Sequence, residues 1–264
     1  MQSHRPFAKR SLGQNFLIDE SVIRRIVDAL GPNEGDVVVE IGPGRGALTE
    51  KLVERKAEVF AFELDTELAR ELKERFRASA TVHIEEADAL KLDFSKIGEG
   101  RNLRLVANLP YNVSTAILQR LFESADAFTE CVLMFQREVV DRIAAQPGTK
   151  ERGYLSVLTQ AHFDVEKLFD VPPTAFRPVP NVWSSVARLK PRSDRPFDPI
   201  ALEAIVSSSF AQKRKTILNN LKNVIADADQ LLLQSGIDPK RRAETISLEE
   251  WFKLSASPHD KLKR

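Results

Sequence analysis

Short apolar segments alternate with helix-like segments over the first two thirds of the chain, and this alternation restricts the fold more than any other feature. Strands alternating with helices favour a parallel sheet covered by helices on both faces. After about Gly153 the pattern changes, and Phe163–Val171 and Val182–Leu189 are expected to add an antiparallel end to the sheet. The five expected parallel strands are Val37–Ile41, Glu58–Phe62, Thr81–Glu85, Leu103–Ala107 and Cys131–Gln136.

A polar, proline-bearing stretch at residues 190–199 separates this part from a C-terminal part that has a helical pattern. With 264 residues the chain can form one large domain or two unequal ones. We therefore divide it into a first domain, residues 1–190, and a small helical domain, residues 197–264. The helices expected in the second domain are Ile200–Phe210, Arg214–Val224, Ala228–Gln234 and Leu248–Leu254.

The composition limits the classes of function. Hydrophobic residues make up 42% and charged residues 29%, as in ordinary soluble globular proteins. The net charge is only +1, so a nucleic-acid-binding surface would need basic residues gathered on one face. Cys131 is the single cysteine, which excludes an intrachain disulfide and a cysteine-rich zinc site. No apolar segment resembles a signal peptide or is long enough to span a bilayer, so we expect a cytoplasmic protein without a membrane or metal partner.

A glycine-rich segment, Glu40–Gly46, follows the first expected strand. Glycine permits positive φ and close approach of a ligand to the backbone. The spacing of Gly42, Gly44 and Gly46 departs from the dinucleotide fingerprint, and the Gly-Lys-Ser/Thr ending of a phosphate-binding P-loop is missing. A plain tight turn is the alternative explanation, but Gly42 and Gly44 are candidate cofactor contacts.

Polar side chains follow the next three strands. Glu63 ends the second strand and can accept hydrogen bonds from a ribose diol, whereas Asp88, after the third, can accept from an adenine amino group or cap a helix. Asn108 follows the fourth strand. Open α/β sheets bind ligands at the carboxyl ends of their strands. The combination therefore predicts a nucleoside cofactor held without a phosphate-binding loop, and S-adenosylmethionine fits best.

The segment Asn108–Tyr111 has the sequence Asn-Leu-Pro-Tyr. It offers an amide side chain, a carbonyl held by the following proline, and a flat ring at one point. These groups can hold an exocyclic amine and stack on the base that bears it, which indicates chemistry on the amino group of a nucleobase.

Taken together, these segments resemble the ribosomal RNA adenine dimethyltransferases over nearly the whole chain. The resemblance implies a Rossmann-like methyltransferase domain that depends on S-adenosylmethionine, followed by a small C-terminal α-helical domain. It further implies dimethylation of N6 of two adjacent adenosines in a hairpin loop near the 3′ end of 16S rRNA, within the immature 30S subunit, and a role in small-subunit biogenesis. It is carried by Lys9–Leu17, Glu40–Gly46, Glu63, Asp88, Asn108–Tyr111, Pro172–Pro178 and Phe210–Lys215.

The same resemblance assigns the parts of the cofactor. Asn15 and Leu17 close over it from the N-terminal segment, and Gly42 lies at its methionine part. The remaining assignments are Glu63 at the ribose, Asp88 at the adenine and Asn108 near the reacting sulfonium.

Our hypothesis for the acceptor adenine uses two hydrogen-bond acceptors, one for each N–H of N6. These are the Asn108 side-chain oxygen and the Leu109 carbonyl, and Pro110 fixes the backbone after them. Tyr111 is expected to stack on the base, with Phe176 as a second platform. Core packing is the alternative for Phe176, and its position between prolines disfavours that alternative.

Two stretches are basic without containing any acid, Thr174–Arg192 and Ser207–Asn223. A solvated helix face is the usual explanation of a short run of charge. Here we expect phosphate contacts, because a small-molecule methyltransferase has no need of the second domain. The residues proposed for RNA binding are Arg177, Lys213, Arg214 and Lys215, joined in the same two stretches by Arg188, Lys190, Arg192 and Lys222 and, near the N-terminus, by Arg5, Lys9 and Arg10.

Three alternatives remain open at this point. The first is an enzyme that methylates large-subunit rRNA, and the second is a ribosome-assembly factor whose catalysis is dispensable. A DNA adenine methyltransferase is a weaker third alternative, since such enzymes usually carry Asp where Asn108 stands. We expect a monomer in each case.

Overall fold

The computed structural model describes Lys9 and residues 13–256, which divide into two compact units. The first unit contains the residues up to Val140 together with Val165–Pro191, and the second contains Asp141–Asp164 and the residues from Arg192 onward. The expected division near residue 190 therefore needs correction, because Asp141–Asp164 groups with the helical C-terminal part. The cause is packing of α6 (Tyr154–His162) against α7 (Pro199–Ser209).

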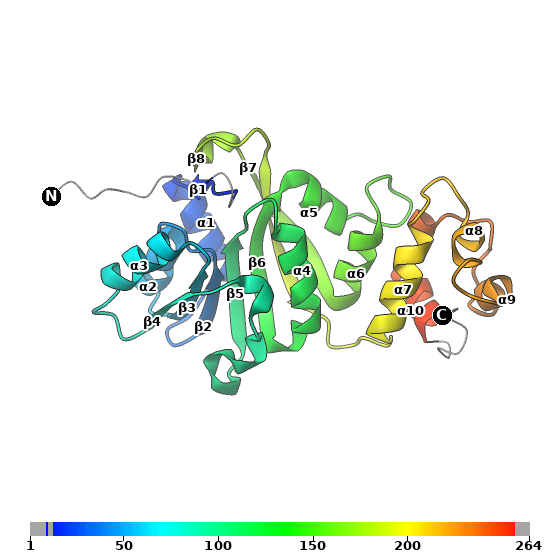
Figure 1. Cartoon of the computed structure of the whole chain (residues 1–264), viewed down its shortest axis with the longest axis horizontal. Coiled ribbons are helices and arrows are strands. Elements are labelled where there is room, and N and C mark those ends of the chain that lie inside the picture. Colours follow the sequence, from blue (N-terminus) through cyan, green and yellow to red (C-terminus); the bar gives the residue numbers. More distant parts are fainter. Residues whose placement is uncertain (1–8, 10–12, 257–264) are drawn as a thin grey trace. The chain divides into compact units, whose positions relative to one another are not determined.

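A seven-stranded sheet forms the centre of the first unit, in the order β4-β3-β2-β5-β6-β9-β7 (Figure 1). Neighbouring strands from β4 to β6 are parallel, and β9 is antiparallel to β6. The predicted parallel sheet with an antiparallel end is thus confirmed. The strands are β2 (Val37–Ile41), β3 (Glu58–Glu63), β4 (Val82–Glu86), β5 (Leu103–Asn108), β6 (Phe128–Gln136), β7 (Phe163–Val171) and β9 (Ser184–Pro191).

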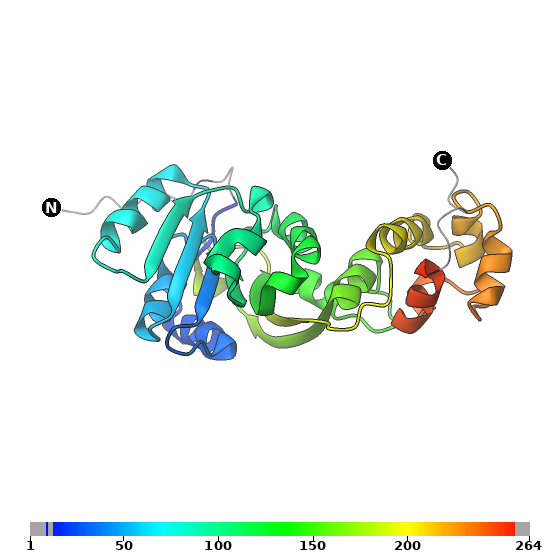
Figure 2. The same cartoon turned by 90° about the horizontal axis from the view of Figure 1, so that it is seen from below.

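Helices cover both faces of this sheet, which explains why a central strand such as β2 is buried along its whole length. Figures 1 and 2 show α1 (Glu20–Leu30) and α4 (Ser114–Glu123) on opposite faces. The sequence interpretation did not include α1, although its buried residues Val22, Ile23, Ile26, Val27 and Leu30 follow helical spacing. The other helices of this region are α2 (Ala47–Glu54), α3 (Thr66–Arg75) and α5 (Arg137–Ile143), the last of which runs across the division between units.

The register of the parallel strands brings their carboxyl ends to one edge of the sheet. Ile41 pairs with Phe62 on one side and with Ala107 on the other. The segments that follow β2, β3 and β5 therefore begin at the same level, which places the glycine loop, Glu63 and Asn108 together.

A separate two-stranded ribbon joins the N-terminal segment to the connection between β7 and β9. In it β1 (Phe16–Leu17) pairs antiparallel with β8 (Phe176–Arg177), and the Ile18 N–H donates to the Ala175 carbonyl at 2.9 Å. Leu17 is buried on this ribbon and belongs to the core around α1.

The second unit is helical, with Trp251 fully buried and its ring 6.1 Å from that of Phe210. The predicted helix Arg214–Val224 is too long, because Thr216 caps the N-terminus of α8 and the preceding residues form an exposed turn. Within the described part of the chain no helix has the length and apolar character needed to cross a membrane. Besides α6 and α7 the unit contains α8 (Ile217–Leu221), α9 (Ala228–Gln234) and α10 (Leu248–Ser255).

Candidate active site

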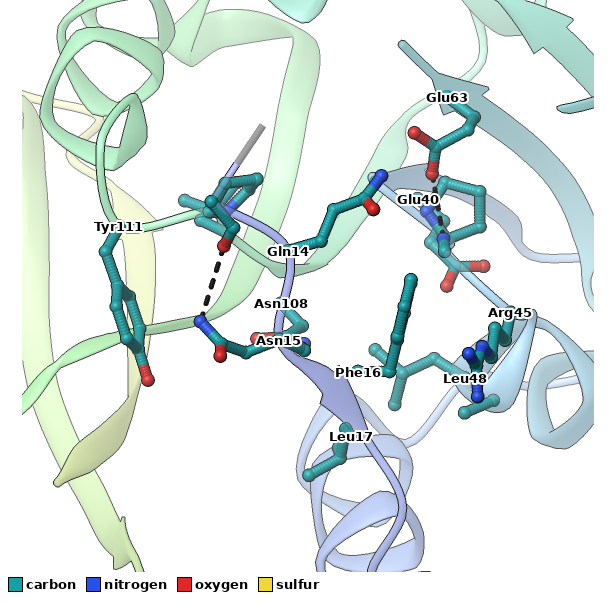
Figure 3. Close-up of a pocket in the computed structure, with 17 residues that line it drawn as sticks. Gln14, Asn15, Phe16, Leu17, Glu40, Arg45, Leu48, Glu63, Asn108 and Tyr111 are labelled. Atoms are coloured by element: carbon teal, nitrogen blue, oxygen red, sulfur yellow. Dashed lines mark hydrogen bonds between the residues drawn. The ribbon is translucent and has the colours of Figure 1, made fainter. Parts of the chain in front are cut away.

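A pocket lies at the carboxyl edge of the first unit's sheet, where β2, β3 and β5 end (Figure 3). Its walls are formed by the N-terminal segment 13–17, the glycine loop 42–45, Glu63 and the segment 108–111. Figure 3 shows the N-terminal segment crossing this pocket between Tyr111 and the glycine loop. The structure thus brings together every predicted cofactor residue except Asp88.

The glycine loop is shaped for close approach. Gly42 and Gly44 have φ values of 66° and 57°, a region that L side chains rarely adopt. A Cβ on Gly44 would lie 3.2 Å from the ring of Phe16, which is itself buried against the loop. The Arg45 guanidinium lies 4.4 Å from the centroid of the same ring. The sequence interpretation missed Phe16, for which only its place between Asn15 and Leu17 was a signal.

Two buried carboxylates face the pocket. Glu63 accepts hydrogen bonds from the backbone N–H groups of Gly44 and Asp65, both at 2.9 Å, yet burial outweighs these bonds and raises its pKa. Glu40 accepts from the Thr49 hydroxyl at 2.6 Å, and burial, with a smaller effect of the Glu63 charge, raises its pKa to about 7. Neither carboxylate forms an ion pair with a described residue. A positively charged ligand would relieve this unfavourable burial.

The N-terminal segment is fastened to the start of α3. Asp65 caps this helix through the Glu67 N–H, and it also accepts from Lys9 Nζ at 2.9 Å and from Gln14 Nε2 at 3.0 Å. Burial alone would raise the pKa of Asp65, but these hydrogen bonds outweigh burial and lower it. Lys9 therefore serves this attachment, whereas Arg5 and Arg10 lie outside the described residues.

The Asn108 side chain is oriented by the N-terminal segment. Its Nδ2 donates to the Asn15 carbonyl at 3.2 Å. The Asn15 side chain in turn donates to the Gly13 carbonyl at 3.3 Å. This hydrogen bond fixes the orientation of the Asn108 amide, and Oδ1 is the atom of that amide that can accept a hydrogen bond from a ligand.

The residues after Asn108 are equally constrained. The Leu109 N–H donates to the Met134 carbonyl at 3.3 Å, and Leu109 is almost fully buried. The Tyr111 hydroxyl lies 2.7 Å from the Ser184 hydroxyl, and burial raises the pKa of this half-buried phenol despite the hydrogen bond. Tyr111 is thus held as a neutral ring beside the pocket.

Asp88 is placed differently from the other cofactor candidates. It caps a short 3₁₀ helix by accepting from the Leu90 N–H at 3.0 Å, and it is absent from the pocket lining. The Ala87 N–H donates to the Glu63 carbonyl at 3.0 Å, so the segments after β3 and β4 are adjacent. Leu64 and Leu90, exposed by 54% and 37%, flank the two acids. The sequence interpretation did not include either leucine, although Leu64 carried a usable signal as a large apolar residue directly after a strand-end acid.

The prediction that Phe176 forms a second stacking platform is wrong in this structure. Its ring is fully buried in the core with Val171 and Ala175, and its backbone pairs with Leu17. A ring that is enclosed by the core has no face for a nucleobase. Neighbouring Arg177 is exposed.

The predicted basic residues differ in their surroundings. Lys213–Lys215 are exposed in the turn before α8. Arg188 instead pairs with Glu130 at 3.2 Å, and Arg192 pairs with Asp164. Charges that are already paired within the protein are poor candidates for phosphate contact, which leaves the turn, Arg177 and exposed Lys190 as the better ones.

The chain is similar to known proteins along almost its entire length. The sequence profile of the family described as ribosomal RNA adenine dimethylase matches residues 7–259. A protein of Aromatoleum aromaticum named ribosomal RNA small subunit methyltransferase A is 44% identical over 97% of this chain and 95% of its own. A protein of Bacillus cytotoxicus with the same name is 45% identical over 95% of this chain and 92% of its own.

Solved structures agree with this assignment. A dimethyladenosine transferase from Plasmodium falciparum has a TM-score of 0.78 at 24% identity, over 90% of this chain and 95% of that one. The 23S rRNA methyltransferase ErmE has a TM-score of 0.70 at 26% identity, over 91% and 98%. The first likeness shows the shared fold, and the family itself is shown by the profile and the curated relatives. The chain therefore belongs to the ribosomal RNA adenine dimethylase family.

Proposed function

We propose that this chain dimethylates N6 of two adjacent adenosines in a hairpin loop near the 3′ end of 16S rRNA. Membership of the family makes it an rRNA adenine dimethyltransferase that uses S-adenosylmethionine. The observation that carries the proposal is the Asn108 amide, whose Nδ2 is held by the Asn15 carbonyl so that Oδ1 is left to accept from the substrate amine. The relatives named as small-subunit methyltransferases support 16S rRNA as the substrate.

The residues of the pocket fit a cationic nucleoside cofactor, which supplies a methyl group already activated on a sulfonium. The buried carboxylates Glu40 and Glu63 offset its positive charge, and Glu63 also accepts from the ribose hydroxyls. Asp88 accepts from the adenine amino group, and Leu64 and Leu90 cover the adenine faces. The backbone contacts come from Asn15, Leu17, Gly42 and Gly44.

The acceptor side works by positioning. The N6 lone pair of adenine is delocalised into the ring, so the amine is a poor nucleophile. Asn108 Oδ1 and the Leu109 carbonyl each accept one N–H, which aims the lone pair at the methyl group, while Tyr111 stacks on the ring. When the N–C bond forms and the methyl group leaves the sulfur, the amine nitrogen becomes cationic and its protons become acidic, so water can take up one of them without a strong base.

RNA binding completes the proposal. The target base must leave its stack, which costs a few kcal/mol and less in a loop than in a duplex. Exposed Arg177 and the turn Lys213–Lys215 contact phosphates of the immature 30S subunit. We assign the activity to a monomer in the cytoplasm.

Substitution of Asn108 by alanine tests the proposal. Asn102→Ala is the matched control, since Asn102 is an exposed asparagine directly before the start of the strand that Asn108 ends. We expect Asn108→Ala to lower the methylation rate of undermethylated 30S particles by about 100-fold or more. The variant should retain its affinity for S-adenosylhomocysteine within a few-fold, and Asn102→Ala should behave like the wild type. The product is measured by mass spectrometry as N6-dimethyladenosine in 16S rRNA, with 23S rRNA as the competing substrate. Near-normal turnover by Asn108→Ala would refute the role of this residue, and preferential methylation of 23S rRNA would refute the proposed substrate.

A further inference from the structure

The segment 178–183, which connects β8 to β9, exposes large apolar side chains. Val179, Val182 and Trp183 are exposed by 52%, 40% and 48%. The other tryptophan of the chain, Trp251, is fully buried. Neighbouring apolar side chains left in solvent commonly mark a binding surface.

This segment lies beside the candidate active site. The Trp183 carbonyl accepts from the Arg137 N–H at 2.9 Å, directly after the carboxyl end of β6. The next residue, Ser184, is the hydrogen-bond partner of the Tyr111 hydroxyl. Figure 1 shows β8 and the adjoining chain at the same edge of the sheet as the N-terminal segment. Trp183 is therefore continuous with the proposed substrate side of the pocket.

The alternation of side chains along the chain argues against a shared role of Trp183 and Tyr111. Side chains alternate along an extended chain, and the buried Ser184 side chain faces Tyr111. Trp183 is expected to face the other way. The two rings cannot enclose one base, so Trp183 is available to a different nucleotide.

Flipping of the target base leaves a neighbouring base to which the Trp183 indole can bind. When the target adenosine leaves its stack, the adjacent unpaired base loses a stacking partner and exposes one face. An exposed indole can replace that partner. The sequence 174–192 around the indole contains no acid, and Arg177 is exposed in it, so this surface suits the phosphate backbone of a nucleic acid better than a basic protein.

We propose that Trp183 binds an unpaired rRNA nucleobase next to the target adenosine by stacking, and so positions the target strand. This inference rests on the proposed function, because it takes the rRNA loop as the substrate. Trp183 touches a neighbouring nucleotide and leaves the reacting atoms to Asn108 and Leu109, so it should act on substrate binding more than on the chemical step.

Two measurements test the inference. In steady-state methylation of undermethylated 30S particles, Trp183→Ala should raise KM by about 5-fold or more with kcat nearly unchanged, and Trp183→Phe should restore KM to within about 2-fold of the wild type. Leu233→Ala, at an exposed apolar residue of α9, is the matched control and should leave KM unchanged. Circular dichroism should show the same folding for all variants.

The second measurement follows the fluorescence of the Trp183 indole. Titration of the S-adenosylhomocysteine-bound protein with a 16S rRNA hairpin oligonucleotide should quench tryptophan fluorescence in the wild type. The quench should be absent in Trp183→Phe, where only buried Trp251 emits. An unchanged KM in Trp183→Ala would overturn the inference. A raised KM without any quench by the oligonucleotide would also overturn it, because the surface would then contact a ribosomal protein. Failure of the proposed function is distinguishable, because the wild type would then form no dimethyladenosine.

Discussion

Replacement of Glu40 by glutamine should remove a pH dependence of stability that the wild-type protein carries near neutrality. Glu40 is fully buried beside Glu63, and its pKa rises from the ordinary 4.5 to about 7. Between these two values the folded protein holds a proton that the unfolded chain has released. Each pH unit in this range therefore lowers the free energy of unfolding by about 1.4 kcal/mol as pH rises.

The total effect amounts to about 3 kcal/mol, since the two pKa values differ by about 2.5. This stabilisation is fully present below pH 4.5 and is lost as pH rises through 7. Glu63 contributes in the same direction, because burial raises its pKa too. Glutamine keeps the shape of Glu40 and the acceptor for the Thr49 hydroxyl, but it carries no titrating proton.

The assay is urea unfolding of the cofactor-free protein at pH 5, 6, 7 and 8. Hydrogen exchange of the β2 backbone amides is the readout, so that unfolding of the first unit is observed. We expect the Glu40→Gln variant to show a much smaller fall in stability with pH than the wild type. Glu54→Gln, an exposed carboxylate on α2, is the matched control and should keep the wild-type slope. An equal pH slope in wild type and Glu40→Gln would refute the argument that an uncompensated buried carboxyl lies in the pocket.

Two further changes separate core residues from RNA-binding ones. Phe176→Ala should lower the free energy of unfolding by about 3–5 kcal/mol in urea titrations, because it empties a buried site; an effect on RNA binding alone would contradict the burial. Simultaneous substitution of Lys213, Arg214 and Lys215 by glutamate should weaken RNA binding and flatten its dependence on salt concentration, measured by filter binding at several ionic strengths, with Lys240→Glu as the exposed control. An unchanged salt slope would remove this turn from the proposed interface.

The site was largely predictable because its parts follow strands that are recognisable as short apolar runs. Asn108, Glu63 and the glycine loop could be brought together from the sequence, since parallel strands end at one edge of a sheet. Glycine at positions 42 and 44 carries a local conformational requirement that the structure shares. Such features depend on local chain geometry and on sheet topology, both of which a sequence pattern contains.

Features that depend on packing between distant segments were not predictable in the same way. Phe176 lies between prolines, which indicated exposure, yet pairing of β8 with the N-terminal β1 encloses its ring. Residues Asp141–Asp164 were assigned to the first domain because they precede the proline-bearing stretch at 190–199, but α6 is held by contacts with α7 far along the chain. Ion pairs such as Arg188 with Glu130 likewise join separate strands and remove charges that the sequence offered for RNA.

The N-terminal segment connects the two halves of the proposed reaction. Its fastening to Asp65 through Lys9 and Gln14 keeps it across the cofactor pocket, and its Asn15 carbonyl orients the Asn108 amide that is proposed to hold the substrate amine. A segment that served only as a cover would affect cofactor affinity alone. Because the same backbone also sets which end of the Asn108 amide is free, loss of the segment should disturb the acceptor geometry even when the cofactor is saturating. The position of the N-terminal segment therefore determines both how the cofactor pocket is covered and how the substrate amine is aligned.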